Sequence, residues 1–102
     1  MIIRVFRARV QSGMANAFER MVQELSIPLV EAQKGLLARY SGKPVGSNAD
    51  EFVMVSVWED LTSLQAFVGE NWEEAIIPEE ERPVLLETTV HHYESFGSAR
   101  TY

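Results

Sequence analysis

The sequence predicts an α+β fold in which strands and helices follow the order β-α-β-β-α-β. Two segments, 2–10 and 52–58, carry apolar side chains on both faces, which is typical of central strands. The second strand in chain order, 36–45, contains Pro44, which indicates an edge position because proline cannot donate a hydrogen bond to a neighbour. This order is the ferredoxin-like, split βαβ arrangement, an antiparallel sheet with its helices on one face.

The first strand, 2–10, separates two sets of side chains. One face holds Ile2, Arg4, Phe6, Ala8 and Val10, and the other holds Ile3, Val5, Arg7 and Arg9. The turn at 11–13 follows, and Ser12 is the expected N-cap of the next helix.

A helical pattern extends over 14–34. Its apolar residues recur at helix spacing: Met14, Phe18, Met21, Val22 and Leu25. Pro28 removes a backbone donor, so we expect a kink or a second short helix beginning near Ser26. Gly35 is expected to end the helix in the left-handed conformation.

The third strand, 52–58, follows a polar hairpin loop at 45–50. Phe52, Met54, Ser56 and Trp58 share one face, and Val53, Val55 and Val57 share the other. Both faces are therefore expected to be covered.

Helix-capping residues, glycine and proline predict the remaining elements. Asp60 or Thr62 caps a helix that Gly69 ends, with a capping box from Thr62 to Gln65. A second capping box, Asn71 with Glu74, predicts a short helix that starts at Trp72 and stops at Pro78. A connector at 79–83 leads to the last strand, 84–93.

Length and composition restrict the class of protein. The 102 residues predict one domain, 1–95, with a C-terminal tail at 96–102. The net charge of −6, from nine basic and fifteen acidic residues, argues against nucleic acid and anionic membrane partners. No segment is long and apolar enough to cross a membrane. The chain has no Cys, which fits a cytoplasmic location and excludes disulfides.

The face of the predicted sheet opposite the helices is apolar. It carries Val53, Val55 and Val57, with Ile3 and Val5 beside them. An uncovered apolar face of this size predicts a homodimer formed sheet to sheet.

Arg7 and Arg9 lie on the same predicted dimer face. Since a buried arginine must be paired, we expect one of them to bridge to Glu87 or to another acid, in its own chain or in the partner's.

These features resemble the antibiotic biosynthesis monooxygenase-like family of dimeric α+β barrels. The resemblance rests on the opening 1–5, the turn at 12–13, the helix end at 34–36, and above all Val57-Trp58-Glu59-Asp60 leading into the second helix. It implies a ligand pocket between the helices and the sheet. The implied pocket residues are Phe6, Met54, Ser56, Trp58 and Phe67, with Trp72 at the rim.

This chain departs from two branches of the family. The haem-degrading branch carries an Asn, a Trp and a His where this chain has Phe6, Phe67 and Ile77, so haem degradation is not expected. The cofactor-free oxygenase branch carries an Asn four residues before the strand-ending Trp, where this chain has Met54.

Three residues are candidates for chemistry. Trp58 would stack on a flat substrate, or alternatively close the core. Arg4 would receive a carboxylate or enolate oxygen, or alternatively lie exposed at the strand end. His92 would act as a general base, or alternatively serve as a hydrogen-bonded strand residue. His91 and His92 point to opposite faces, and no metal site or cofactor is expected.

The resemblance implies a cofactor-independent monooxygenase acting on a small aromatic, polyketide-like substrate. The alternatives are a non-catalytic small-molecule-binding or interaction dimer and, less favoured, a haem-binding protein. The acidic side chains of 70–81 are expected to form a solvated surface. They are Glu70, Glu73, Glu74, Glu79, Glu80 and Glu81.

Overall fold

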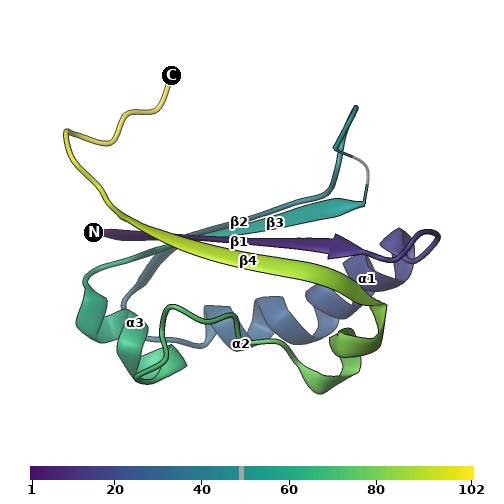
Figure 1. Cartoon of the computed structure of the whole chain (residues 1–102). Coiled ribbons are helices and arrows are strands. Elements are labelled where there is room, and N and C mark those ends of the chain that lie inside the picture. Colours follow the sequence, from purple (N-terminus) through teal and green to yellow (C-terminus); the bar gives the residue numbers. More distant parts are fainter. Residues whose placement is uncertain (49) are drawn as a thin grey trace.

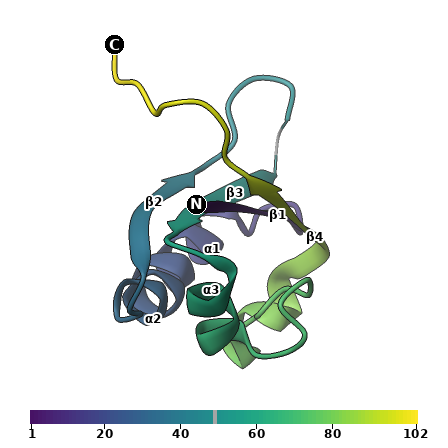
Figure 2. The same ribbon diagram turned by 90° about the vertical axis from the view of Figure 1, so that its left-hand side faces the viewer.

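The computed structural model describes residues 1–48 and 50–102 as one sheet with its helices on a single face (Figure 1; Figure 2). The strands are β1 (Ile2–Val10), β2 (Leu36–Gly42), β3 (Glu51–Trp58) and β4 (Leu85–Glu94). The helices are α1 (Ala15–Met21), the π-helix η1 (Val22–Ser26), α2 (Ile27–Glu31), α3 (Leu61–Val68) and the 3-10 helix η2 (Glu79–Val84). The hairpin loop expected at 45–50 includes Ala49, which lies outside the described residues.

The sheet order is β2-β3-β1-β4, and every neighbouring pair is antiparallel. The predicted ferredoxin-like fold is confirmed, with β1 and β3 in the centre and β2 at an edge. The sheet of one chain is open. In the register of the central pair, Arg4 lies opposite Ser56 and Phe6 lies opposite Met54. Strand pairing therefore places the expected pocket residues side by side on the inner face, which the helices cover.

The first helical segment runs from Ala15 to Glu31 and widens into the π-helix η1 just before Pro28. Pro28 has no N–H to donate to the carbonyl of Glu24, and a local π turn lets the chain pass this gap without ending the helix. The second helical piece, α2, begins at Ile27, one residue after the expected start.

Ser12 is not the N-cap that the sequence suggested. The N-cap is Met14, which makes no side-chain capping bond. Gly13 has a φ of 83°, so the chain is still turning after Ser12 and the helix starts later.

The first helical segment ends at Glu31, so the helix predicted over 14–34 is too long at its C-terminal end. Gly35 lies in the turn that follows and has the predicted left-handed conformation, with a φ of 85°. Its carbonyl accepts a hydrogen bond from the Glu59 N–H at 2.8 Å, which joins the turn before β2 to the β3–α3 turn. A Cβ at this position would collide with the side chain of Ser63. Two separate requirements therefore select glycine here.

Asp60 is the residue that caps α3, through a carboxylate oxygen that accepts from the Ser63 N–H at 2.8 Å. The Thr62–Gln65 capping box is not formed. Gly69 ends α3 with a φ of 83°.

The prediction of a helix starting at Trp72 is wrong, because residues 70–74 form a turn. The carbonyls of Trp72 and Glu74 accept hydrogen bonds from the Arg4 guanidinium, at 2.6 and 3.0 Å. A side chain from the sheet therefore binds the acceptors that a helix would use. The stretch expected as a connector, 79–83, instead lies within η2.

The core consists of two clusters at opposite ends of the sheet. One contains Ala8, Val10, Phe18, Phe52 and Val84, and the other contains Val30, Trp58 and Leu64. Phe18 and Phe52 meet edge to face with ring centroids 4.9 Å apart. Burial of large apolar side chains at both ends leaves the middle of the layer between helices and sheet to other residues.

The outer face of the sheet carries the residues expected at a dimer interface. Val53, Val55 and Val57 are half-buried there. Arg9 donates to the Glu87 carboxylate at 2.9 Å, so the predicted pairing is confirmed within one chain. Arg7 lies 4.0 Å from a Glu51 carboxylate oxygen. Among the described residues, no helix is long and apolar enough to cross a membrane.

Candidate functional site

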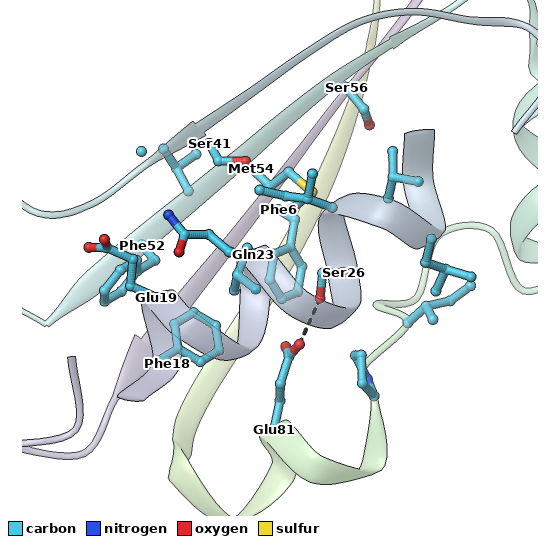
Figure 3. A pocket seen from close by; sticks show the side chains of 18 of the residues that line it. Phe6, Phe18, Glu19, Gln23, Ser26, Ser41, Phe52, Met54, Ser56 and Glu81 are labelled. Carbon is cyan, nitrogen blue, oxygen red and sulfur yellow. Dashed lines mark hydrogen bonds between the residues drawn. The ribbon is translucent and has the colours of Figure 1, made fainter. Parts of the chain in front are cut away.

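A cavity of about 260 Å³ lies between the inner face of the sheet and the segment formed by α1, η1 and α2 (Figure 3). Four phenylalanines line it: Phe6, Phe18, Phe52 and Phe67. The polar side chains that line it are Arg4, Glu19, Gln23, Ser26, Ser41, Lys43, Ser56 and Glu81. A concave, mainly apolar space with a few placed polar groups is the usual form of a small-molecule site.

The structure brings five of the residues predicted for catalysis or for the pocket to this cavity. They are Arg4, Phe6, Met54, Ser56 and Phe67. All except Phe67 come from the inner face of β1 and β3, where strand alternation directs every second side chain toward the helices. Trp58, Trp72 and His92 do not line the cavity and act on it through other residues.

Trp58 is completely buried, and its neighbours are protein side chains. Its indole N–H donates to the Ser56 hydroxyl at 2.9 Å. Its ring stacks on Phe67 with centroids 5.5 Å apart and an angle of 19° between the planes. Because Ser56 and Phe67 both line the cavity, Trp58 fixes the position of two wall residues without reaching the space itself.

Arg4 is buried, with 7% of its surface exposed, so the strand-end alternative is wrong. Besides the carbonyls of Trp72 and Glu74, its Nη1 lies 2.8 Å from Nε2 of His92. A guanidinium can only donate, so Nε2 of His92 accepts and the imidazole is neutral, with its proton on Nδ1. The ring of Trp72 meets the ring of His92 edge to face.

Burial sets the ionisation of this cluster. It lowers the pKa of the Arg4 guanidinium, and it lowers the pKa of His92, which the positive charge of Arg4 lowers further. The charge of Glu73 acts on the pKa of His92 in the opposite direction. The outcome is a fixed positive charge at the cavity wall, held by a neutral histidine and two carbonyls.

Glu81 corrects the expectation of a solvated acidic surface. Glu70, Glu73, Glu74, Glu79 and Glu80 are exposed, but Glu81 is only 3% exposed and lines the cavity. Its carboxylate accepts a hydrogen bond from the Ser26 hydroxyl at 2.7 Å (Figure 3).

A sequence signal for Glu81 did exist. In a 3-10 helix, residues three apart share a face. Glu81 lies three residues from both Pro78 and Val84, and Val84 belongs to the core. This three-residue spacing has no meaning in an irregular connector, which is the structure that the sequence predicted for 79–83.

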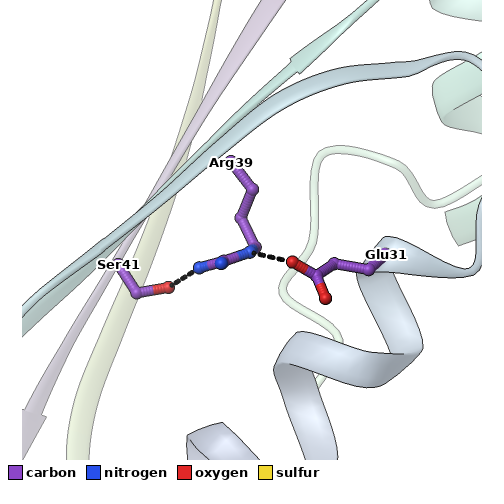
Figure 4. A network of polar contacts seen from close by, with 3 residues as sticks. All are labelled: Glu31, Arg39 and Ser41. Carbon is purple, nitrogen blue, oxygen red and sulfur yellow. Dashed lines mark hydrogen bonds and ion pairs between the residues drawn. The ribbon is translucent and has the colours of Figure 1, made fainter.

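Ion pairs at the open edge join the helices to the edge strand. Arg39 on β2 donates to Glu31 at the end of α2 at 3.1 Å, and to Ser41 at 2.7 Å (Figure 4). Lys43 pairs with Glu19 of α1 at 3.2 Å. Ser41, Lys43 and Glu19 line the cavity, so these contacts hold one of its walls in place.

In residues 1–48 and 50–102, no three acidic or histidine side chains are grouped as a metal ion would need. His91 is exposed, and His92 lies on the inner side of β4, opposite Arg4 in the strand register.

The chain is similar to solved structures over nearly its whole length. A candidate antibiotic biosynthesis monooxygenase from Deinococcus radiodurans has a TM-score of 0.77 at 10% identity, covering 100% of this chain and 99% of that one. A variant of SnoaB, a cofactor-independent oxygenase from Streptomyces nogalater, has a TM-score of 0.73 at 13% identity, covering 95% and 94%. A variant of MhuD with two manganese protoporphyrin IX molecules per active site has a TM-score of 0.75 at 19% identity, covering 99% and 100%. At these identities the likeness establishes the fold.

No curated protein sequence matches the chain. The family model described as antibiotic biosynthesis monooxygenase matches residues 1–75, which include β1, β2, β3 and α3. The chain therefore belongs to the antibiotic biosynthesis monooxygenase family.

Proposed function

We propose that this protein is a cofactor-independent monooxygenase that oxidises a small aromatic substrate in the cavity between helices and sheet. The observation that carries the proposal is the cavity itself, with its four phenylalanines and the buried guanidinium of Arg4. Membership of the family and the shared fold with a cofactor-independent oxygenase support the reaction type.

The lining favours a flat, apolar molecule that can ionise. Aromatic walls offer stacking and edge contacts to aromatic rings. The volume of about 260 Å³ exceeds the roughly 150 Å³ of an apolar cavity that takes up benzene, so there is room for more than one ring. An anthrone, which is a fused aromatic ketone with an acidic methylene group, has these properties.

The proposed reaction balances without a further cofactor. The methylene carbon loses two hydrogens and gains one atom of O₂ as a carbonyl oxygen. The other oxygen atom leaves as water with the two hydrogens. The substrate supplies all the electrons, and it does so from its enolate, which is more easily oxidised than the neutral ketone.

In this proposal, Arg4 stabilises the enolate. A positive charge in a site of low polarity favours a negative charge that develops nearby. Hydrogen bonds to Trp72 and Glu74 and the contact with His92 hold the guanidinium in place. His92 is therefore a positioning residue for Arg4, and Trp58 is a positioning residue for Ser56.

We further propose that two copies associate through the outer face of the sheet. The half-buried valines Val53, Val55 and Val57 lie there, beside exposed Tyr40 and Tyr93. Covering these apolar surfaces would stabilise a dimer by the hydrophobic effect. The charged end of the same face, with the Arg9–Glu87 pair, would fix the orientation of the two copies.

Oxygen consumption with dithranol, a dihydroxyanthrone, tests the function. Because anthrones react slowly with air, the rate must exceed that of two references, buffer alone and the variant Val22→Trp, which fills the cavity from η1. Val45→Trp adds the same side chain at a loop position that is 80% exposed, and it should keep the wild-type rate. With oxygen-18 gas, the quinone product should contain one labelled atom.

Two other experimental outcomes would indicate a different function. Saturable dithranol binding with no oxygen uptake above the Val22→Trp background would indicate a non-catalytic binding protein. A shifted Soret band on titration with haemin would indicate haem binding. We expect no such shift, since no histidine occurs among the described residues that line the cavity.

A further inference from the structure

Glu81 is a buried carboxylate that the proposed function leaves without a role. It lies on η2, is 3% exposed, and points from that helix toward the cavity and Ser26 (Figure 3). Carboxylates are rarely buried to this extent unless they are paired. The described part of the chain contains no lysine, arginine or histidine within ion-pair distance of Glu81.

The two oxygens of this carboxylate differ. Oε2 accepts the hydrogen bond from Ser26 at 2.7 Å. Oε1 accepts none from any described residue. Yet no fully enclosed side-chain oxygen or nitrogen in the described part of the chain lacks a hydrogen-bond partner. Oε1 is therefore not fully enclosed, and Glu81 is one of the residues that line the cavity.

The surroundings make this carboxylate a stronger base than an exposed one. Burial raises the pKa of Glu81, the Ser26 hydrogen bond opposes this, and the charge of Glu80 adds to it. None of the other charged groups that line the cavity pairs with Glu81. Glu19 and Lys43 pair with each other, and Arg4 binds the carbonyls of the 72–74 turn.

We propose that Glu81 is the general base of the cavity, whose Oε1 removes a proton from the acidic methylene or phenol group of the bound aromatic. For an anthrone, the C–H bond breaks and an O–H bond forms on Oε1. The electron pair stays on the substrate and delocalises onto its carbonyl oxygen as the enolate. This role rests on the proposed function, to which it adds the proton acceptor.

The positions of Glu81, Arg4 and His92 decide which of them can act as the base. A general base must accept a proton and therefore needs a free lone pair in the cavity, which Oε1 has and the guanidinium of Arg4 does not. His92, expected from the sequence as the base, points its Nε2 at Arg4 instead. Ser26 fixes the carboxylate by one oxygen and leaves the other free.

Proton removal can be measured without oxygen. Under nitrogen in D₂O, the base should exchange the methylene hydrogens of dithranol for deuterium, which mass spectrometry detects. We expect exchange faster than buffer with the wild type and with Glu70→Gln, a matched loss of one exposed acid. Glu81→Gln, which keeps shape but cannot accept the proton, should fall to the Val22→Trp background. Glu81→Asp should retain part of the rate.

In air, the same variants report on turnover. We expect Glu81→Gln to lower kcat with dithranol by about 10²- to 10⁴-fold, the usual contribution of a general base, while tryptophan-fluorescence titration shows nearly unchanged dithranol binding. The wild-type rate should rise with pH as Glu81 ionises. Ser26→Ala removes the bond that lowers the pKa, so it should move this rise to higher pH.

The outcomes separate the two proposals. Exchange by the wild type that disappears in Glu81→Gln, without oxygen uptake, would support the base and reject the oxygenase. Oxygen uptake that persists in Glu81→Gln with the same pH profile would overturn the base and leave the oxygenase. No wild-type exchange above background would overturn the base as well. Circular dichroism of each variant confirms that it is folded.

Discussion

Nη1 of Arg4 lies 2.8 Å from Nε2 of His92, across the pairing of β1 with β4. Two residues with basic side chains thus make a hydrogen bond, which requires the imidazole to be neutral. The same guanidinium holds the carbonyls of Trp72 and Glu74. The protonation of one histidine therefore bears on the attachment of the 72–74 turn to the sheet.

Stability should depend on pH through His92. Its pKa in the folded protein is lowered from 6.5 by burial and by Arg4, so the unfolded chain binds the proton more readily. This contribution to stability is present above about pH 6.5 and is lost as the pH falls through the lower, folded pKa. We expect His92→Gln to reduce the loss of Tm between pH 7 and pH 5. His91→Gln, at an exposed neighbouring position, should keep the wild-type slope.

The contribution of Glu81 to stability should change with pH in the opposite direction to that of His92. Burial raises its pKa in the folded state from 4.5, so the folded protein binds the proton more readily than the unfolded chain. Stability from this group is present below about pH 4.5 and is lost as the pH rises through the folded pKa. Relative to the wild type, Glu81→Gln should therefore gain stability in urea unfolding between pH 4.5 and pH 7. A constant difference across this range would contradict the burial of an ionising carboxylate.

Gly35→Ala should destabilise the protein by more than Gly13→Ala. Both glycines have a positive φ, 85° and 83°, so both variants bear a backbone cost of about 1–2 kcal/mol. Only at Gly35 would the new methyl group also collide with Ser63, whereas the space beside Gly13 is open. Chemical denaturation of the two variants measures the difference. Equal losses would show that the turn at Gly35 can move away from α3.

Ser56→Ala should cost about 1–3 kcal/mol, because it leaves the buried Trp58 indole N–H without an acceptor. Ser41→Ala removes a hydroxyl from an exposed contact with Arg39 and should change the free energy of unfolding by less than about 0.5 kcal/mol. Urea titrations followed by tryptophan fluorescence provide both values. A neutral Ser56→Ala would mean that Trp58 finds another acceptor.

The proposed dimer can be tested at Val55. Val55→Lys places a charge in the middle of the outer face, where burial against a second copy would be costly. Light scattering should give twice the mass of one chain for the wild type and a single chain for Val55→Lys. Val45→Lys, at an exposed loop position, should remain dimeric. A monomeric wild type at micromolar concentration would overturn the outer-face interface.

The strand pattern was predictable because it depends on local periodicity. Alternation along 2–10 and 52–58 assigns each side chain to a face, and antiparallel pairing then places Arg4, Phe6, Met54 and Ser56 together. The Arg9–Glu87 pair could likewise be predicted from the sequence, since a charge in an apolar strand face needs a partner. Asp60, one of the two caps expected for α3, is a local signal for the start of a helix. Gly35 is left-handed as expected but lies beyond the helix end at Glu31.

The segment 70–84 was not predictable in the same way. Its capping box indicates a helix, but Arg4, nearly seventy residues earlier, binds the carbonyls of Trp72 and Glu74. Its run of acids indicates a surface, but η2 turns Glu81 inward to Ser26. Both outcomes depend on partners that are distant in the sequence.

The sequence by itself therefore determined the order of the strands and of the helices between them, the two faces of the sheet and the strand residues of the cavity wall, because strand and helix periods act over a few residues. Tertiary structure alone decided that Trp58 is a support behind Ser56 and Phe67, that His92 holds Arg4, and that Glu81 faces the cavity. Each of these depends on a hydrogen bond or ring contact whose partner is set by packing, and packing brings together side chains that no local pattern relates.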